Sequence, residues 1–239
     1  MEPPVHYFQQ VESTQDVAHR LAAEGAVAGT AVVAAEQSAG RGSRGRAWVS
    51  GLGGLWLSVV WRPEAATGAE TLSLRAALLL AEALEAAGSP PLGIKWPNDL
   101  MQGERKVGGI LCEARWAGDR LGWIVVGAGI NVRNPIPPAL AGRAGALQPA
   151  SGSLEPAGLI RPAVAALRRA GIRTGPLDTH ELAAFAGRDW LAGRALTSPV
   201  PGQADGIAPD GALRVRTAGG SVELLRSGTV QSGVPTFQP

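Results

Sequence analysis

The chain has 239 residues, of which 45% are hydrophobic, and a formal net charge of +2. This length accommodates one large domain or a large domain with a small appendage. Its apolar runs fall far short of the ~20 residues that cross a bilayer, and no basic segment followed by an apolar one opens the chain. Cys112 is the only cysteine, which favours a reducing compartment. We expect a globular cytoplasmic protein without a membrane partner.

Arginine supplies 20 of the 22 basic residues, and the only lysines are Lys95 and Lys106. The small net charge gives no reason to expect a nucleic-acid partner. Arginine presents a planar fork and lysine a compact point charge, so the two are not interchangeable. Lysines retained in so arginine-rich a chain predict a functional role for both.

The first predicted helix follows a short lead, starts at Ser13-Thr14 with Ser13 as N-cap, and ends at Gly25. The two hydroxyls either cap the helix, face a ligand, or do both. His19 has no metal ligand near it in sequence, and we expect it at the surface. The apolar run 31–35 predicts a strand that leads into the next motif.

The most informative stretch is the loop Gly40-Arg41-Gly42-Ser43-Arg44-Gly45-Arg46, followed by Ala47-Trp48. Its glycines let the backbone approach a ligand closely, and its arginines fit the geometry of a phosphate or carboxylate. The same pattern also occurs in solvated turns and in RNA-contacting tracts. Other motifs must therefore decide whether the loop binds an anion.

Further strands and helices follow in order. A strand is predicted at 55–61, a helix at 72–87, and a short strand that ends at Trp96-Pro97 before the turn Asn98-Asp99. The next strand begins at 105, where Gly108-Gly109 predicts close approach of a ligand to the backbone. A strand at 122–126 leads into 127–131, whose glycine pattern is incomplete for dinucleotide binding and precedes no crossover helix.

The last part of the chain changes in texture. We expect a loop at 135–149 that orders on binding, and helices at 159–170 and 178–191. Short strands at 194–197, 203–207, 212–217 and 221–225 predict a small antiparallel barrel. We expect two domains, 1–191 and 192–239, and periodicity alone assigns the class α+β.

Four motifs together resemble those of the biotin protein ligases: Gln37 to Trp48, Lys95-Trp96-Pro97-Asn98-Asp99, Lys106 to Leu111, and Gly127 to Asn131. The resemblance covers nearly the whole chain. It implies a mixed, mostly antiparallel sheet flanked by helices, like the class II aminoacyl-tRNA synthetase core, with a C-terminal barrel of the Src-homology-3 type. It also implies an ATP-dependent ligase that forms biotinyl-5′-AMP and passes biotin to a lysine of a biotin carboxyl carrier protein.

The resemblance assigns roles residue by residue. Lys106, Arg41 and Lys95 would be catalytic, with Lys106 holding the biotin carboxylate against the α-phosphate and Lys95 supporting the phosphates. The biotin-binding residues would be Ser13, Thr14, Gln37, Gly40, Arg41, Lys106, Gly109 and Gly129. The nucleotide-binding residues would be Arg44, Arg46, Trp48, Lys95, Asn98, Lys106 and Asn131. Asp99 would bind the Mg²⁺ of MgATP or orient an arginine.

Two features depart from the family pattern. Many members have arginine where this chain has Ser43, which bears on how tightly the loop retains the adenylate. Some members carry a DNA-binding domain ahead of the first catalytic helix, whereas here that helix begins at Ser13, and we expect a ligase that is not a repressor. The resemblance leaves open whether the chain forms a homodimer. The alternatives are a lipoate ligase, which activates a different acid, and an RNA-binding module that uses the arginine loop.

Overall fold

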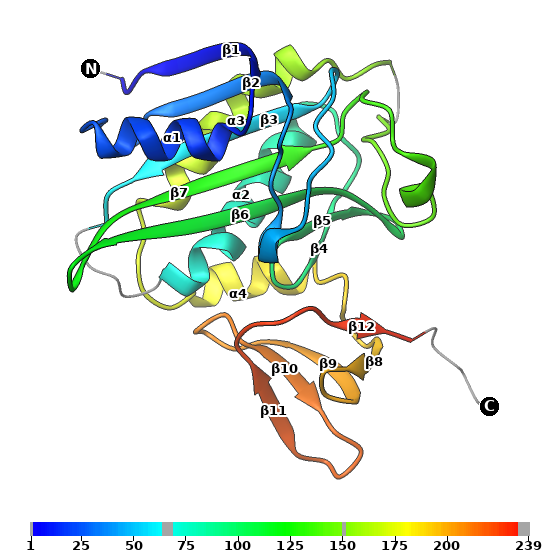
Figure 1. The fold of residues 1–239 in the computed structure, drawn as a ribbon. Helices are drawn as coiled ribbons and strands as arrows, with labels where there is room; N and C mark the ends of the chain where they lie inside the picture. Colours follow the sequence, from blue (N-terminus) through cyan, green and yellow to red (C-terminus); the bar gives the residue numbers. More distant parts are fainter. Residues whose placement is uncertain (1, 64–68, 150–151, 234–239) are drawn as a thin grey trace.

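A seven-stranded sheet dominates the computed structural model, which describes residues 2–63, 69–149 and 152–233 (Figure 1). Its strand order is β1 (Val5–Val11), β2 (Ala31–Gln37), β3 (Leu55–Trp61), β7 (Arg120–Ile130), β6 (Arg105–Ala117), β5 (Asp99–Gln102) and β4 (Gly93–Lys95). β1 and β2 are parallel and the other pairs antiparallel. The sheet is therefore mixed and mostly antiparallel, as expected.

Strand β1 corrects the sequence analysis, which treated residues before Ser13 as a short lead. It lies at one edge of the sheet, and its residues from Tyr7 to Gln10 are exposed. An edge strand with few buried residues shows no clear alternation of apolar and polar positions, so periodicity misses it. Only its pairing with β2 makes it a strand.

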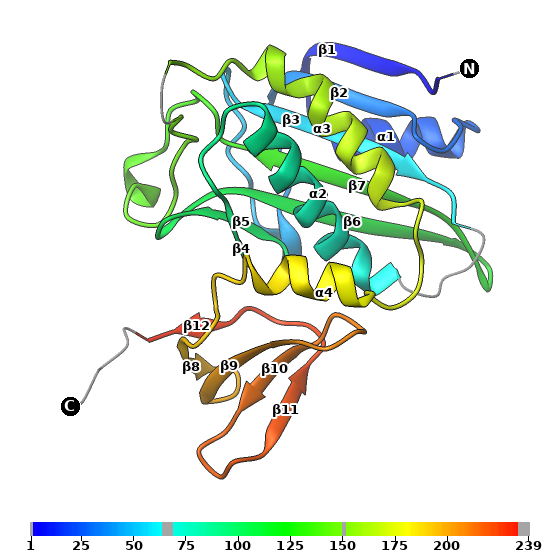
Figure 2. The same cartoon turned by 180° about the vertical axis from the view of Figure 1, so that it is seen from behind.

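Helices cover both faces of the sheet. The helix α1 (Thr14–Ala23) lies on one face, and α2 (Leu72–Ala86) and α3 (Pro156–Ala170) pack side by side on the other (Figures 1 and 2). Successive strand residues point to opposite faces. Leu57 and Val59 accordingly join the large core beneath α2 and α3, while Val60 and Val125 join Ala18 of α1 in a smaller one.

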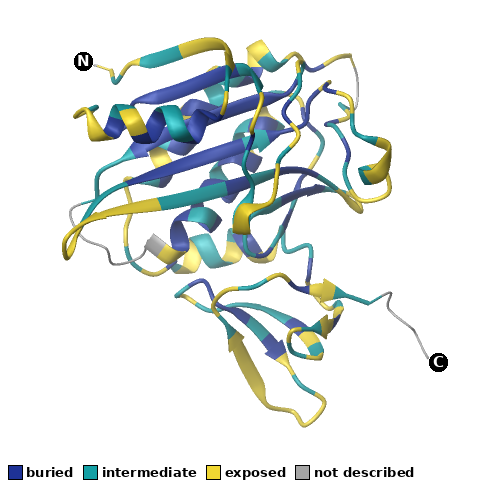
Figure 3. Ribbon diagram, in the orientation of Figure 1, coloured by how far each residue is buried: buried dark blue, intermediate teal, exposed yellow. Residues whose placement is uncertain are grey.

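The face that carries α1 has few side chains beyond the helix. Gly127 and Gly129 follow Val125 at alternate positions of β7, and Gly109 of β6 pairs with Gly129. The residues of β3 and of the second half of β7 are nevertheless largely buried (Figure 3). Because these glycines lack side chains, this part of the sheet surface forms a shallow depression, and residues from other segments cover it.

A second sheet of five antiparallel strands follows α4 (Thr179–Ala186) and lies below the first in Figure 1. Its order is β11 (Val222–Leu225), β10 (Leu213–Arg216), β9 (Gly202–Ile207), β8 (Ala195–Ser198) and β12 (Gln231–Ser232). This small sheet agrees with the expected barrel, and β12 had not been predicted. Residues 234–239 of the expected second domain lie outside the described residues, and the boundary at 191/192 stays a proposal.

Helix α4 is shorter than the predicted 178–191. Asp178 and Glu181 form a capping box at its start, and Gly187 ends it. The chain then runs beside β4, where Ile94 exchanges backbone hydrogen bonds with Arg188 and Trp190. Tertiary pairing therefore replaces the last helical turn that the sequence suggested.

The backbone of the 135–149 loop is hydrogen-bonded to the neighbouring strand β6. It contains a short 3₁₀ turn, η3 (Pro138–Leu140), and Lys106 N donates to Arg143 O at 2.9 Å while Gly145 N donates to Lys106 O at 2.9 Å. The loop thus binds both the amide and the carbonyl group of Lys106. That the loop orders on binding stays a prediction. Among the described helices, none has the length and apolar character to cross a membrane.

Candidate functional site

The glycine–arginine loop folds back on itself and lies in front of the sheet (Figure 1). Gly42 N donates to Arg46 O at 2.7 Å and Trp48 N donates to Gly40 O at 2.8 Å. A Cβ atom at Gly40 would lie 2.4 Å from Trp48 O, so the tight return needs glycine there. At the tip, η1 (Ser43–Gly45), Arg44 has a positive φ of 61°.

Trp48 and Lys106 meet over the glycine-bearing area of the sheet. A Cβ atom at Gly129 would lie 2.7 Å from Trp48 Nε1, so the indole rests directly on the strand backbone. Lys106 Nζ lies 5.0 Å from the centroid of the same indole and 2.5 Å from Asp99 Oδ1. A Cβ atom at Gly109 would stand 3.4 Å from Lys106 Nζ. The end of the glycine–arginine loop therefore lies next to Lys106, over Gly109 and Gly129.

Lys95 lies beside this group but faces a different partner. Its Nζ is 5.0 Å from the ring centroid of Trp190, which follows α4. Burial lowers the pKa of Lys95, with Asp99 opposing and Lys106 and Arg194 adding to the shift. Lys95 is thus close enough to feel Lys106 and Asp99 electrostatically, and an ammonium with a lowered pKa gains from an incoming anion.

The residues predicted to contact an acid's head group form a hydrogen-bonded chain. Thr14 Oγ1 donates to Gln37 Oε1 at 3.1 Å and lies 2.9 Å from Ser58 Oγ. Gln37 Nε2 donates to Ser50 Oγ at 2.8 Å. Ser13 is buried and caps α1, accepting a bond from Gln15 N. The structure brings Thr14 and Gln37 together, while the Ser13 hydroxyl serves the helix end.

Arg41 belongs to a polar cluster that the sequence analysis missed. Its Nη2 lies 2.7 Å from Glu113 Oε2 and 2.9 Å from Asp16 Oδ1. Glu113 also lies 3.2 Å from His19 Nε2. The expectation of a surface His19 is wrong, because the residue is 9% exposed and packs between Glu113 and Trp123. Side chains alternate along β6, so Glu113 lies on the same face of the sheet as Gly109. This alternation could have indicated Glu113 as a site residue.

Four predicted nucleotide-binding residues use their side chains elsewhere. Arg44 Nη1 donates at 2.5 Å to Oγ1 of Thr229, which lies between β11 and β12, and Arg46 folds back onto Ser43. The amide of Asn98 donates to Ile110 O at 2.5 Å. The buried Asn131 donates to Gly145 O at 3.0 Å and supports the 135–149 loop. These contacts hold the loops around the site, and their roles toward a nucleotide stay predictions.

Asp99 is the residue that the resemblance assigns to Mg²⁺. Within the described parts of the chain, no group of three His, Cys, Asp or Glu side chains could hold a metal ion. Asp99 instead pairs with Lys106. Mg²⁺ commonly binds through one or two carboxylates plus substrate phosphates. A single carboxylate paired with a lysine therefore fits a cation that arrives with a triphosphate.

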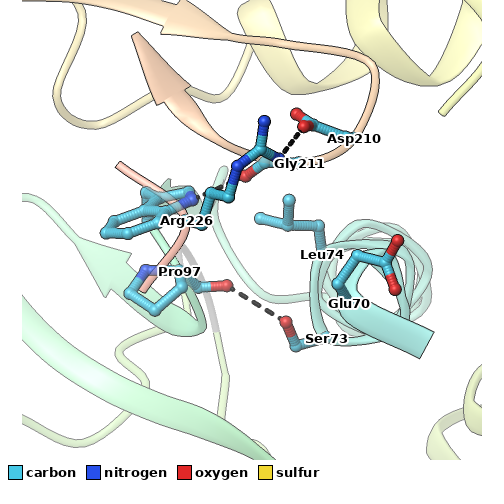
Figure 4. A pocket seen from close by; sticks show the side chains of 8 residues that line it. Glu70, Ser73, Leu74, Pro97, Asp210, Gly211 and Arg226 are labelled. Atoms are coloured by element: carbon cyan, nitrogen blue, oxygen red, sulfur yellow. Dashed lines mark hydrogen bonds and ion pairs between the residues drawn. The ribbon is translucent and has the colours of Figure 1, made fainter. Parts of the chain in front are cut away.

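A cavity of about 310 Å³ lies apart from this site, between the start of α2 and the second sheet (Figure 4). Its lining consists of Glu70, Ser73, Leu74, Trp96, Pro97, Asp210, Gly211 and Arg226. An Arg226–Asp210 ion pair crosses its rim. Trp96 and Pro97 of the second motif line it, whereas none of the residues predicted to bind biotin or nucleotide does. The candidate site remains the group around Trp48 and Lys106.

Known proteins resemble the chain in sequence and in fold. The bifunctional ligase/repressor BirA of Bacillus spizizenii is 33% identical over 240 residues, covering 95% of this chain and 73% of that protein. The biotin–[acetyl-CoA-carboxylase] ligase of Paracoccus denitrificans is 38% identical over 164 residues, covering 67% of this chain and 62% of that protein.

A solved structure of biotin protein ligase from Aquifex aeolicus, in complex with biotin and ATP, superposes with a TM-score of 0.81. It is 25% identical, and the superposition covers 96% of this chain and 99% of that one. The family model described as "Biotin/lipoate A/B protein ligase family" matches residues 7–131. That range contains all four motifs named above. The chain belongs to the biotin/lipoate A/B protein ligase family.

Proposed function

We propose that this chain is a biotin protein ligase. It activates the biotin carboxylate with MgATP and then passes biotin to a lysine of a biotin carboxyl carrier protein. One observation carries the proposal. Lys106 of β6 meets Trp48, which follows the glycine–arginine loop, over Gly109 and Gly129. The relatives whose names include biotin ligation and the Aquifex aeolicus complex with biotin and ATP support the choice of substrates.

In the first step, a biotin carboxylate oxygen attacks the α-phosphorus of ATP, and the bond to the leaving pyrophosphate breaks. Two anions must approach each other, so the barrier depends on positive charge placed between them. Lys106 suits this role because its ammonium has three donors and lies over the loop's indole. Lys95 supports the phosphates from the side of Trp190, and Mg²⁺ enters with them.

The same side chains bind and shield the product of that step, biotinyl-5′-AMP. Thr14 and Gln37 hydrogen-bond the polar head of biotin, and Arg41 meets its carboxylate. Trp48 packs against the adenylate. In the second step, the amine of the carrier lysine attacks the acyl carbon, AMP leaves with the bonding electron pair, and the amine loses a proton. The product is an amide.

The test is acid-dependent release of pyrophosphate. The purified chain is incubated with MgATP and either biotin or lipoate, and pyrophosphate is measured over time. We expect release with biotin, followed by biotin addition at a single lysine of a carrier domain, seen by mass spectrometry. Release with lipoate alone would assign the chain to lipoate ligation.

A further inference from the structure

We propose that Glu113 is a positioning residue of this ligase, which holds the Arg41 guanidinium where it receives the carboxylate of the acid. Glu113 itself would touch neither biotin nor ATP. The inference rests on the proposed function, because the role of Arg41 toward the acid belongs to it. It adds a residue on β6 that none of the four motifs includes.

The carboxylate of Glu113 is contacted by three residues from two segments, helix α1 and the glycine–arginine loop. Its Oε2 accepts from Arg41 Nη2 at 2.7 Å, from Gln15 Nε2 at 3.1 Å, and lies 3.2 Å from His19 Nε2. The Glu113 side chain is only 23% exposed. A half-buried carboxylate with this many partners has little freedom to move. It therefore offers Arg41 a fixed point on the sheet.

The histidine of this cluster is held in one orientation. Trp123 Nε1 donates to His19 Nδ1 at 3.0 Å, so Nδ1 is an acceptor and the ring proton lies on Nε2, facing Glu113. The hydrogen bond from His19 lowers the pKa of Glu113, helped by the charge of Arg41 and opposed by burial. Glu113 therefore stays ionised at neutral pH and keeps its attraction for Arg41.

The contacts of Arg41 indicate that Glu113 positions its guanidinium and does not compete with the acid for it. Both carboxylates, Glu113 and Asp16, contact the same nitrogen, Nη2. The Nε atom of Arg41 is buried and has no hydrogen-bond partner among the described residues. A guanidinium has five N–H donors. Anchoring at one nitrogen leaves further donors for a ligand carboxylate, so Glu113 and the acid can occupy different sides of Arg41.

The test measures steady-state pyrophosphate release by Glu113→Gln as a function of biotin and of ATP. Gln lacks the charge and turns an amide toward donors, so we expect the KM for biotin to rise about tenfold or more, from the loss of a charge-assisted hydrogen bond. The KM for ATP and kcat should change little. Glu113→Asp keeps the charge and should recover part of the loss. In the Arg41→Ala background, Glu113→Gln should add no further rise.

Glu85→Gln is the matched control. Glu85 pairs with Arg188 on the α2 side of the molecule, and its side chain is likewise 23% exposed. This variant loses a comparable ion pair and should keep the KM for biotin. If Glu113→Gln does not fold, His19→Ala removes one donor to Glu113 and should raise that KM about threefold.

Different outcomes would contradict the positioning role of Glu113 and the proposed ligase function. An unchanged KM for biotin in the variants of an active enzyme overturns the positioning role alone. A lowered KM would make Glu113 a competitor of the acid, which also overturns it. Additive effects of Glu113→Gln and Arg41→Ala would show a merely structural contribution. Lack of biotin-dependent release in the unmodified chain would defeat the proposed function instead.

Discussion

Lys106 is fixed through its main chain and its side chain at once. Its backbone binds Arg143 and Gly145, and its ammonium lies between Asp99 and the Trp48 ring. A lysine is flexible by itself, and ordering its side chain costs conformational entropy. Here the contacts with the surrounding loop and strand offset part of this cost.

We expect both Lys106→Ala and Lys106→Arg to lower the rate of adenylate formation about 100-fold, the usual effect of losing a donor to developing charge. Arginine keeps the charge, but its planar fork cannot take the place of a compact ammonium 2.5 Å from Asp99. Biotin-dependent pyrophosphate release measures the rate. Arg105→Ala, an exposed neighbour in β6, should remain active. Near-normal turnover of Lys106→Arg would contradict the assigned role.

Lys95 predicts a pH dependence. Because burial lowers its pKa below the ordinary 10.5, the folded chain loses this proton at a pH where the unfolded chain still holds it. The unfavourable charge burial is present at neutral pH and disappears as the pH rises through that window, so this contribution to stability grows with pH. The phosphates lose a cation over the same window.

We expect kcat/KM for ATP to fall as the pH rises toward 10.5, measured at saturating Mg²⁺. In Lys95→Arg the guanidinium stays protonated, so the alkaline fall should shrink even if activity is lower throughout. A fall of the same size and position in the variant would assign the titration to another group.

At the scale of elements, strong local patterns were enough to predict β3 and α2. Their bounds, Leu55–Trp61 and Leu72–Ala86, match the predicted ranges almost residue for residue, because their apolar content is high and Gly88 follows the helix. β1 was missed because an exposed edge strand carries no such pattern. The mixed, mostly antiparallel character of the sheet was implied only by the family resemblance, and its strand order was not predicted.

The candidate site was predicted in part. The motifs indicated Trp48, Lys106 and Asp99, which the structure brings together. The bond from His19 to Glu113 spans 94 residues and joins α1 to β6. Helical periodicity gives the face on which His19 lies, but the strand opposite that face depends on tertiary packing. No local rule contains this information.

The contact of β7 with the loop predicts the effect of Gly129→Ala. The added methyl group would lie 2.7 Å from Trp48 Nε1, and the indole must move. Overpacking costs about 1–3 kcal/mol, so we expect a roughly tenfold rise in the KM for ATP with the fold retained. Kinetics and Trp fluorescence measure this. Gly122→Ala on the same strand is the control, and Trp48→Ala combined with Gly129→Ala should behave like Trp48→Ala alone.

At the scale of the whole molecule, several contacts join the second sheet to the first. Trp96 Nε1 donates to Gly211 O at 2.8 Å, and Arg194 pairs with Glu104 at 2.6 Å. The tip of the glycine–arginine loop also reaches across, through the bond from Arg44 to Thr229. The loop over the proposed active site is therefore attached at its tip to the segment between β11 and β12.

We expect Thr229→Val to loosen this loop in the free enzyme, because valine keeps the shape of threonine and removes the acceptor. Losing a hydrogen bond worth about 1 kcal/mol should raise the open population roughly fivefold. Limited trypsin digestion at the loop arginines should accelerate by the same factor when opening is fast. Thr217→Val changes a threonine bonded only within its own hairpin and should leave the rate unchanged. Equal cleavage rates for Thr229→Val and the unmodified chain would show that the contact restrains nothing.

The 135–149 loop binds Lys106 through main-chain hydrogen bonds, and Leu147 N donates to Asn131 O at the end of the segment. Amide and carbonyl groups are common to nearly all residue types, so substitutions at exposed positions of this segment should leave these main-chain bonds intact. Deleting a single residue between Asn131 and Leu147 would instead shift every donor out of reach. Evolutionary drift can therefore change exposed positions of this segment, such as Ala141 and Gly142, as long as its length and its buried Gly145 and Leu147 are kept.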